Sequence, residues 1–244
     1  MRVATWNLEN VRPGDGARSQ RFRNAIAEIA ADVWVLTESH PDFVPATGYV
    51  RHAVSAEAPD RVGGGRWVVI WVGAEIAALP LAVVAEPERS AAVQVNRADG
   101  RPLLVFGTVL PWRGDTRREV RGGRAFAQSL RLQATDWAAA RAALPGAELC
   151  IAGDFNQELG ADGPVGTRAG REALDGTLEA LDLTCVTGGA QDPLLVRGWR
   201  ASIDHILLSS GLRGAAAPEI WPEQFPLSGM LSDHYGVCVR VADA

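Results

Sequence analysis

The chain has 244 residues, 47% of them hydrophobic, which suits one globular α/β domain spanning residues 1–244. Its formal net charge of −5 at pH 7 differs from that of a protein that coats nucleic acid through charge alone. The 24 basic residues are all arginine, and the absence of lysine excludes a Walker-type phosphate loop and Schiff-base catalysis.

Cysteine usage and the length of the apolar runs indicate the compartment. The three cysteines are odd in number, lie in apolar surroundings and lack metal-type spacing, so we expect reduced, buried thiols. The first ten residues, MRVATWNLEN, are typical of a strand and not of a signal peptide. No apolar run approaches the length of a membrane span. We therefore expect a cytoplasmic, monomeric protein without a membrane partner.

Eight short apolar runs, rich in β-branched residues and bounded by Gly, Pro or Asp, predict strands. They cover residues 2–6, 33–37, 66–72, 91–96, 103–109, 148–152, 202–208 and 235–241. Three segments have a helical pattern. They are residues 22–33, with Ser19 as a possible N-cap, residues 124–144, and residues 171–181. Many strands and few helices, without strict alternation, predict an α/β (α+β) fold in which sheet packs on sheet with helices outside.

Polar side chains stand at the ends of five of these runs. They are Asn7 and Glu9, Glu38, Asp154 and Asn156, Asp204, and Asp233 with His234. In a sheet with antiparallel members, the C-terminal ends of some strands and the N-terminal ends of others share one rim, so all five groups can meet there. Carboxylate and amide oxygens suit Mg²⁺ or Mn²⁺, and the lack of a Cys/His cluster argues against zinc. A histidine paired with an aspartate serves as a general base or as a charged phosphate clamp. The combination indicates hydrolysis of a phosphate ester.

The ordered motifs TWN, a glutamate-ended second strand, GDFN, SIDH and SDH resemble the endonuclease/exonuclease/phosphatase superfamily. This superfamily includes the AP endonucleases, the pancreatic-type deoxyribonucleases, the neutral sphingomyelinases and the inositol polyphosphate 5-phosphatases. The resemblance extends from Thr5 to Val237. It implies a four-layer sandwich, two β-sheets face to face with helices on each outer side. It also implies a Mg²⁺-dependent phosphoric ester hydrolase.

The resemblance further implies which residues hold the metal. Glu38 is the expected central ligand, and Asn7 is expected to support the metal and its waters. Asp233 resembles a second acid near the metal, and Glu9 is a weaker candidate of the same kind. Each has a structural alternative: Glu38 as a solvated acid at a strand end, Asn7 as a turn former, and Asp233 as a cap before the last strand.

Four residues resemble the family's catalytic groups. Asp154 matches the residue that orients or deprotonates the attacking water, and Asn156 matches the amide that holds a phosphoryl oxygen. On an extended strand end, residues i and i+2 point to the same side, so both would face one phosphate while Phe155 enters the core. An Asx-type turn is the alternative for this pair. His234 resembles the catalytic histidine, with Asp204 holding the ring and raising its pKa.

One position departs from the family pattern. Val109 stands where many members carry a histidine or tyrosine, and it cannot contact phosphate; Arg113, four residues on, is a substitute donor beside Trp112. The arginines of this stretch form either a phosphate-binding arm or a solvated helix entry. They are Arg113, Arg117, Arg118, Arg121, Arg124 and Arg131.

Two tryptophans bear on the substrate. Trp112 and Trp199 are candidate stacking faces for bases, with packing against the sandwich as the alternative. We therefore expect a phosphodiester hydrolase acting on nucleic acid. The alternatives are a small-molecule phosphatase or phosphodiesterase, and a non-catalytic binding module on the same fold.

Overall fold

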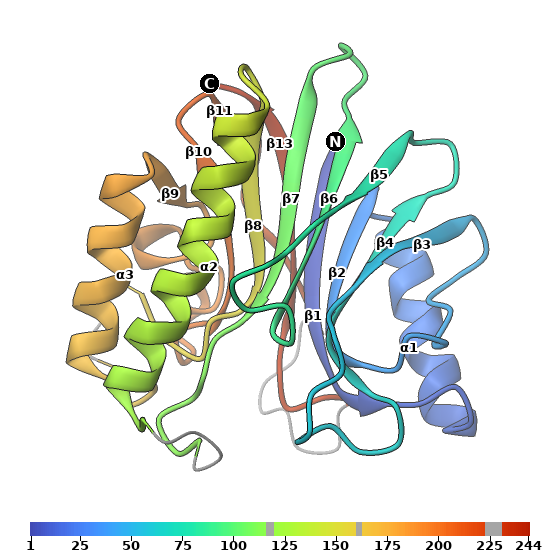
Figure 1. The fold of residues 1–244 in the computed structure, drawn as a ribbon. Coiled ribbons are helices and arrows are strands. Elements are labelled where there is room, and N and C mark those ends of the chain that lie inside the picture. Colours follow the sequence, from blue (N-terminus) through green and yellow to red (C-terminus); the bar gives the residue numbers. More distant parts are fainter. Residues whose placement is uncertain (116–119, 160–162, 223–230) are drawn as a thin grey trace.

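Two mixed β-sheets pack face to face in the computed structural model, which describes residues 1–115, 120–159, 163–222 and 231–244 (Figure 1). The first sheet has the order β11-β13-β1-β2-β4-β3, with β12 also pairing with β13. Its strands are β1 (Arg2–Val11), β2 (Val33–Ser39), β3 (Tyr49–Val54), β4 (Arg66–Gly73), β11 (Leu212–Gly214), β12 (Glu219–Trp221) and β13 (Gly236–Asp243). The second sheet has the order β5-β6-β7-β8-β10-β9. Its strands are β5 (Ala78–Leu81), β6 (Ser90–Asn96), β7 (Pro102–Val109), β8 (Glu148–Asp154), β9 (Leu183–Cys185) and β10 (Asp204–Ser209).

Helices cover the outer face of each sheet. Helix α1 (Gly16–Ile29) lies outside the first sheet, and α2 (Gly123–Ala143) and α3 (Arg168–Ala180) lie side by side outside the second (Figure 1). The layers are therefore helix, sheet, sheet and helices. This confirms the four-layer sandwich that the sequence motifs implied.

Three apolar layers hold these elements together: one between the sheets, one between the first sheet and α1, and one between the second sheet and helices α2 and α3. Between the sheets, valines and other aliphatic side chains of both sheets interdigitate, with Val35, Val105 and Ile206 fully buried. Outside the first sheet, Phe22 of α1 packs edge-on against Trp6 with ring centroids 4.8 Å apart. Since central strands are apolar on both faces, their sequences appear as continuous apolar runs.

The eight predicted strands are all present, although several bounds differ. The prediction missed β3, β5, β9, β11 and β12, which are short strands or lie at sheet edges. Such strands bury few side chains and therefore leave a weak pattern in the sequence. Within the described residues, no helix is both long and apolar enough to cross a membrane.

The start and the end of the first helix were predicted wrongly. Helix α1 begins at Gly16, and Ser19 lies inside it, buried, with its hydroxyl donating to the carbonyl oxygen of Arg12 at 2.6 Å. Val33 belongs to β2 and not to the helix, because Ala30 adopts a left-handed conformation with φ 50° that ends α1. The helical spacing of Val33 was therefore a coincidence of two adjacent apolar elements.

Candidate active site

The polar strand ends meet at one rim of the sandwich. Strands β8 and β10 are antiparallel neighbours, and their register places Asp154 directly opposite Asp204. In the first sheet, β1 runs parallel to β2 and places Asn7 opposite Thr37, the residue before Glu38. His234 directly precedes the segment that leads into β13, which pairs antiparallel with β1. The C-terminal ends of β1, β2 and β8 and the N-terminal ends of β10 and β13 thus bring their polar groups together.

The histidine is held by an aspartate. His234 Nδ1 lies 2.6 Å from Asp204 Oδ2, and the side chains are 13% and 3% exposed. The backbone around the histidine is fixed to the first sheet, since Trp6 Nε1 donates to the carbonyl oxygen of His234 at 3.1 Å. The hydroxyl of Ser232 donates to the carbonyl oxygen of Asn7 at 2.7 Å and accepts from the backbone N–H of His234. The ring orientation is therefore set by partners on both sheets.

Charge and burial act in opposite directions on this pair. Burial lowers the pKa of His234, but the charges of Asp204 and Asp154 and the hydrogen bond to Asp204 outweigh it and raise that pKa well above its ordinary value. Burial raises the pKa of Asp154, partly offset by the positive charge of His234. The arrangement favours an imidazolium next to a carboxylate that takes up a proton more readily than an exposed aspartate.

The GDFN motif is built on unusual backbone conformations. Gly153 has φ 149°, and a Cβ there would lie 2.0 Å from the carbonyl oxygen of Thr108, so only glycine fits. Asn156 is left-handed with φ 50°, and its backbone N–H donates to Asp154 Oδ1 at 2.9 Å. The expectation of an extended strand through Asn156 is therefore wrong: β8 ends at Asp154, and the Asx-type turn follows. Phe155 is fully buried, as expected.

Glu38 also has a left-handed backbone, with φ 49°. Non-glycine residues adopt this conformation infrequently, and strained residues cluster at functional sites. Its carboxylate accepts from Asn7 Nδ2 at 3.2 Å, from Asn10 Nδ2 at 3.0 Å and from Arg61 Nη1 at 3.0 Å. The same Asn7 amide donates to Asp154 Oδ2 at 3.1 Å. One amide therefore joins the two acids across the two sheets.

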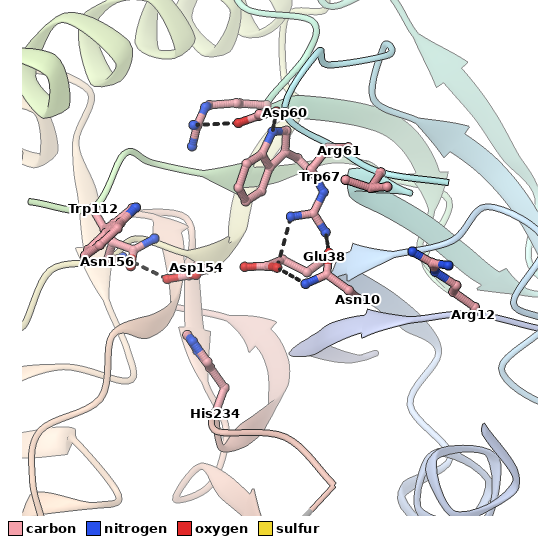
Figure 2. Close-up of a pocket in the computed structure, with 12 residues that line it drawn as sticks. Asn10, Arg12, Glu38, Asp60, Arg61, Trp67, Trp112, Asp154, Asn156 and His234 are labelled. Atoms are coloured by element: carbon pink, nitrogen blue, oxygen red, sulfur yellow. Dashed lines mark hydrogen bonds and ion pairs between the residues drawn. The ribbon is translucent and has the colours of Figure 1, made fainter. Parts of the chain in front are cut away.

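Several of these side chains line a cavity of about 500 Å³ (Figure 2). Of the predicted site residues, it contains Glu38, Trp112, Asp154, Asn156 and His234. The other lining residues were not predicted from the sequence, and they are Asn10, Arg12, Asp60, Arg61, Val62, Trp67 and Arg89. Several of these belong to the loop that contains Gly63-Gly64-Gly65 before β4, and this glycine run was the one available signal.

Trp67 on β4 contacts two arginines of the cavity. The guanidinium carbons of Arg61 and Arg89 each lie 4.3 Å from its ring centroid. The Arg61 side chain is only 5% exposed and contacts Glu38, while Arg89 pairs with Asp115 at 2.6 Å. Stacking on an indole and pairing with a carboxylate fix both guanidinium groups.

Two groups of side chains have the donors that a divalent cation needs. Asp154, Asp204 and His234 each offer one ligand atom, and these atoms lie within 4.8 Å of one another. A histidine must be neutral to bind a metal, and the raised pKa of His234 works against that. The second group is Glu38 and Asp154, which the Asn7 amide joins. The carboxylate oxygens of these two acids are the hard donors that Mg²⁺ and Mn²⁺ prefer. The residues therefore fit a divalent cation, and the second group fits better.

Two of the predicted acidic ligands lie apart from the cavity lining. Glu9 is half-exposed and pairs with Arg18 at 3.2 Å. The Asp233 side chain is 72% exposed, and its Oδ1 lies 3.9 Å from His234 Nε2. Asp233 and His234 line another cavity of about 310 Å³, together with Arg200 and Tyr235.

The predicted substrate-binding residues separate into three groups. Trp112 is 56% exposed at the cavity, whereas Arg113 is exposed and is not among the lining residues. Trp199 is half-buried and stacks on Tyr235 with ring centroids 5.5 Å apart, so it packs against the protein and its role as a free stacking face is not supported. Arg117 lies outside the described residues. Val109 is fully buried between the sheets and cannot reach a phosphate.

The model of the Endonuclease/Exonuclease/phosphatase family matches residues 4–234. The chain belongs to this family. Members of the family are hydrolytic, metal-dependent phosphoesterases, so the family supports a phosphoesterase. A comparison with curated proteins gives no match.

Solved structures share the fold over almost the entire chain. The catalytic domain of human Nocturnin with bound sulfate is 16% identical, with a TM-score of 0.68 over 100% of this chain and 94% of that one. A mannosyl-6-phosphatase from Bacteroides thetaiotaomicron is 14% identical, with a TM-score of 0.67 over 99% of each chain. D. rerio TDP2 complexed with a single-strand DNA product is 15% identical, with a TM-score of 0.66 over 99% of this chain and 98% of that one. At these identities the likeness shows the fold alone.

Proposed function

We propose that this protein is a Mg²⁺- or Mn²⁺-dependent phosphodiester hydrolase that acts on nucleic acid, with distorted or single-stranded sites preferred over intact duplex. The observation that supports it most is the amide of Asn7, which donates to both Glu38 and Asp154. This amide joins Glu38 to Asp154, and the ligand atoms of Asp154, Asp204 and His234 lie within 4.8 Å of one another. Glu38, Asp154 and His234 line one cavity.

Each catalytic residue has a role that suits its surroundings. Asp154 orients or deprotonates the attacking water, since its raised pKa favours proton uptake near neutral pH. Asp204 holds Nδ1 of His234, and the imidazolium stabilises negative charge on the phosphorane-like transition state. Asn156 holds a phosphoryl oxygen, and its amide is already positioned by a 3.0 Å hydrogen bond to the carbonyl oxygen of Leu110.

The cation is assigned to Glu38 and Asn7, with Asp154 adjacent. When bound, it neutralises charge on the phosphoryl oxygens as a Lewis acid. Arg61 now donates to the Glu38 carboxylate from a nearly buried position, and it keeps that carboxylate at the cavity wall. The Glu38 carboxylate, as the proposed metal ligand, is thus oriented by the protein itself and needs no cation to hold its position.

The substrate assignment is supported by the cavity wall formed by Trp112. A Cβ added to Gly114 would lie 2.4 Å from Trp112 Cζ3, so the indole lies directly against that glycine. Trp112 is 56% exposed, so one face of the ring that contacts Gly114 is accessible for a base to stack on. The exposed Arg121 and Arg124 near the start of α2 contribute positive charge to the protein surface, which attracts the phosphates of nucleic acid. The fold shared with TDP2 bound to single-strand DNA product agrees with this choice.

A small-molecule phosphatase is the second candidate. A cavity of about 500 Å³ is also the size of a site for a small ligand. The fold is equally shared with a mannosyl-6-phosphatase. A non-catalytic binding module is disfavoured, because Asp154, Asn156 and His234 all line the same cavity.

A substrate panel tests the proposal. Plasmid DNA, an abasic duplex, single-stranded DNA, RNA, inositol phosphates and a chromogenic phosphodiester would be incubated with the protein in Mg²⁺ and in Mn²⁺. His234→Ala serves as the control for contaminating nucleases. Cleavage of nucleic acid by the wild type alone is the expected result. Turnover of soluble phosphate esters without any cleavage of nucleic acid would contradict the proposal and support the small-molecule phosphatase instead.

A further inference from the structure

Arg12 differs from the other arginines of the cavity. Arg61 is paired with Glu38, and Arg89 is paired with Asp115. The Arg12 side chain also lines the cavity, but it makes no hydrogen bond or ion pair within the part of the chain that the structure describes. Its backbone is nevertheless fixed, since its N–H donates to Asp15 Oδ2 at 2.8 Å.

The Arg12 guanidinium rests on a glycine. A Cβ added to Gly63 would lie 3.1 Å from Cζ and 3.2 and 3.3 Å from the two terminal nitrogens of Arg12. Three atoms at nearly equal distance mean that the planar group faces the Gly63 backbone at close range. Gly63 has φ 65°, a conformation suited to glycine, and it follows Arg61 by two residues. The guanidinium therefore contacts the loop on one side, while Arg12 as a whole is exposed and its N–H donors remain accessible.

Arg12 is also displaced from the catalytic group. Asp154 is linked through Asn7 to Glu38, and Glu38 is linked in turn to Asn10, two residues before Arg12. In Figure 2, Glu38 and Asn10 appear between Asp154 and Arg12. A phosphate at Asp154 and His234 would thus be bound by residues other than Arg12. The positive charge of Arg12 faces a different part of the same cavity.

We propose that Arg12 binds a second phosphate of the substrate, separate from the phosphate that is attacked at Asp154. This inference rests on the proposed function, because it assumes that the attacked phosphate lies beside Asp154 and His234. A guanidinium with unoccupied N–H donors suits a phosphate, whose oxygens accept both hydrogen bonds of the fork. A strand of nucleic acid supplies such a second phosphate in every nucleotide, whereas an isolated phosphate ester supplies none. Arg12 would therefore make the enzyme selective for substrates with consecutive phosphates.

The first test measures binding without turnover. Thymidine 3′,5′-bisphosphate, thymidine 5′-monophosphate and thymidine 3′-monophosphate would be titrated calorimetrically into the protein with EDTA present. We expect the wild type to bind the bisphosphate about tenfold more tightly than either monophosphate, as for one added charged hydrogen-bonded contact. In Arg12→Gln, the affinity for the bisphosphate should fall to the affinity for the monophosphate that binds more tightly. Arg240→Gln, at an exposed position of β13 opposite Arg2 and so at the end of β1 away from Asn7, is the matched control for the change in net charge.

A second variant separates charge from position. Gly63→Ala keeps the arginine but places a methyl group where the guanidinium now rests, and we expect it to lose part of the bisphosphate preference. Thermal unfolding of the variant shows whether the positive φ has destabilised the fold instead. With single-stranded DNA, Arg12→Gln should also lower the slope of log binding constant against log salt by about 0.7.

The two proposals can fail separately. If Arg12→Gln retains the full bisphosphate preference, the second-phosphate site is wrong, whatever the enzyme cleaves. If the substrate panel shows only soluble phosphate esters as substrates and the preference still depends on Arg12, the site stands and the substrate is a small bisphosphorylated ester. Equal affinity of the wild type for bisphosphate and monophosphates would also overturn the inference.

Discussion

The side-chain amide of Asn7 on β1 donates a 3.1 Å hydrogen bond to Asp154 on β8 and so joins the two sheets at the active-site rim. Asn7 is 1% exposed and Asp154 is 2% exposed. Replacing Asn7 by Ala leaves a buried carboxylate without this donor, which costs about 1–3 kcal/mol. We expect a lower unfolding temperature and a reduced kcat. Asn96→Ala, at an exposed strand end, is the control and should change neither.

Asp154 and His234 should be required for the chemical step. We expect Asp154→Asn and His234→Ala each to lower kcat at least about 100-fold, which is about 2.7 kcal/mol, the scale of losing one positioned charge-stabilising group. Steady-state kinetics measure the loss, and circular dichroism checks that the fold is retained. More than about a tenth of wild-type turnover in either variant would contradict the assigned roles.

Activity should depend on a divalent cation bound through Glu38. EDTA is expected to abolish turnover, and Mg²⁺ or Mn²⁺ to restore it. Glu38→Gln should raise the metal concentration needed for half-maximal activity about tenfold or more, because a charged ligand is lost. Asp204→Asn provides the comparison: if it raises this concentration more than Glu38→Gln does, the cation lies with Asp154, Asp204 and His234 instead.

The pH dependence should follow the two raised pKa values. Asp154 acts when it is deprotonated, so kcat/KM should rise with pH through a pKa above the ordinary value of about 3.9. His234 acts when it is protonated, so activity should fall only well above about 6.5. Because burial raises the pKa of Asp154 to about 7, activity should still be rising at neutral pH, and the plateau should lie at mildly alkaline pH, below the raised pKa of His234. Asp204→Asn removes a charge that raises the pKa of His234, and the alkaline limb should move to lower pH. An unchanged limb would exclude His234 as the group that titrates there.

The two tryptophans should respond differently to substitution. Trp112→Ala removes an exposed ring at the cavity, and we expect KM for single-stranded DNA to rise about 5- to 100-fold, the range for one stacked base. Trp199 stacks on Tyr235, so Trp199→Leu should lower the unfolding temperature and leave KM nearly unchanged. Gly114→Ala, which pushes a methyl group toward the Trp112 ring, should raise KM in the same direction as Trp112→Ala. The opposite pattern would indicate that nucleic acid contacts the Trp199 side.

The sequence by itself determined the long central strands and the main polar groups of the rim. Runs such as Val33–Leu36 are buried on both faces, and burial of this kind leaves a continuous apolar signal in the chain. Glu38 and Asp154 directly follow or end such runs, so their place at a strand end is a local property. The pattern of runs predicted sheet packed on sheet with helices outside, and the resemblance that the motifs carry added the four layers and named residues that line the cavity.

Only the tertiary structure decided which further residues share that cavity. Arg12 and Arg61 are placed by the backbone of Gly63 and by the ring of Trp67, contacts between separate segments that no local pattern encodes. Trp112 and Trp199 are both tryptophans in arginine-containing loops, and only the contact of Trp199 with Tyr235 distinguishes a packed ring from an exposed one. The turn at Asn156 likewise depends on its hydrogen bonds to Asp154 and to Leu110. Strand ends are set by neighbours in sequence, whereas the cavity wall is set by neighbours in space.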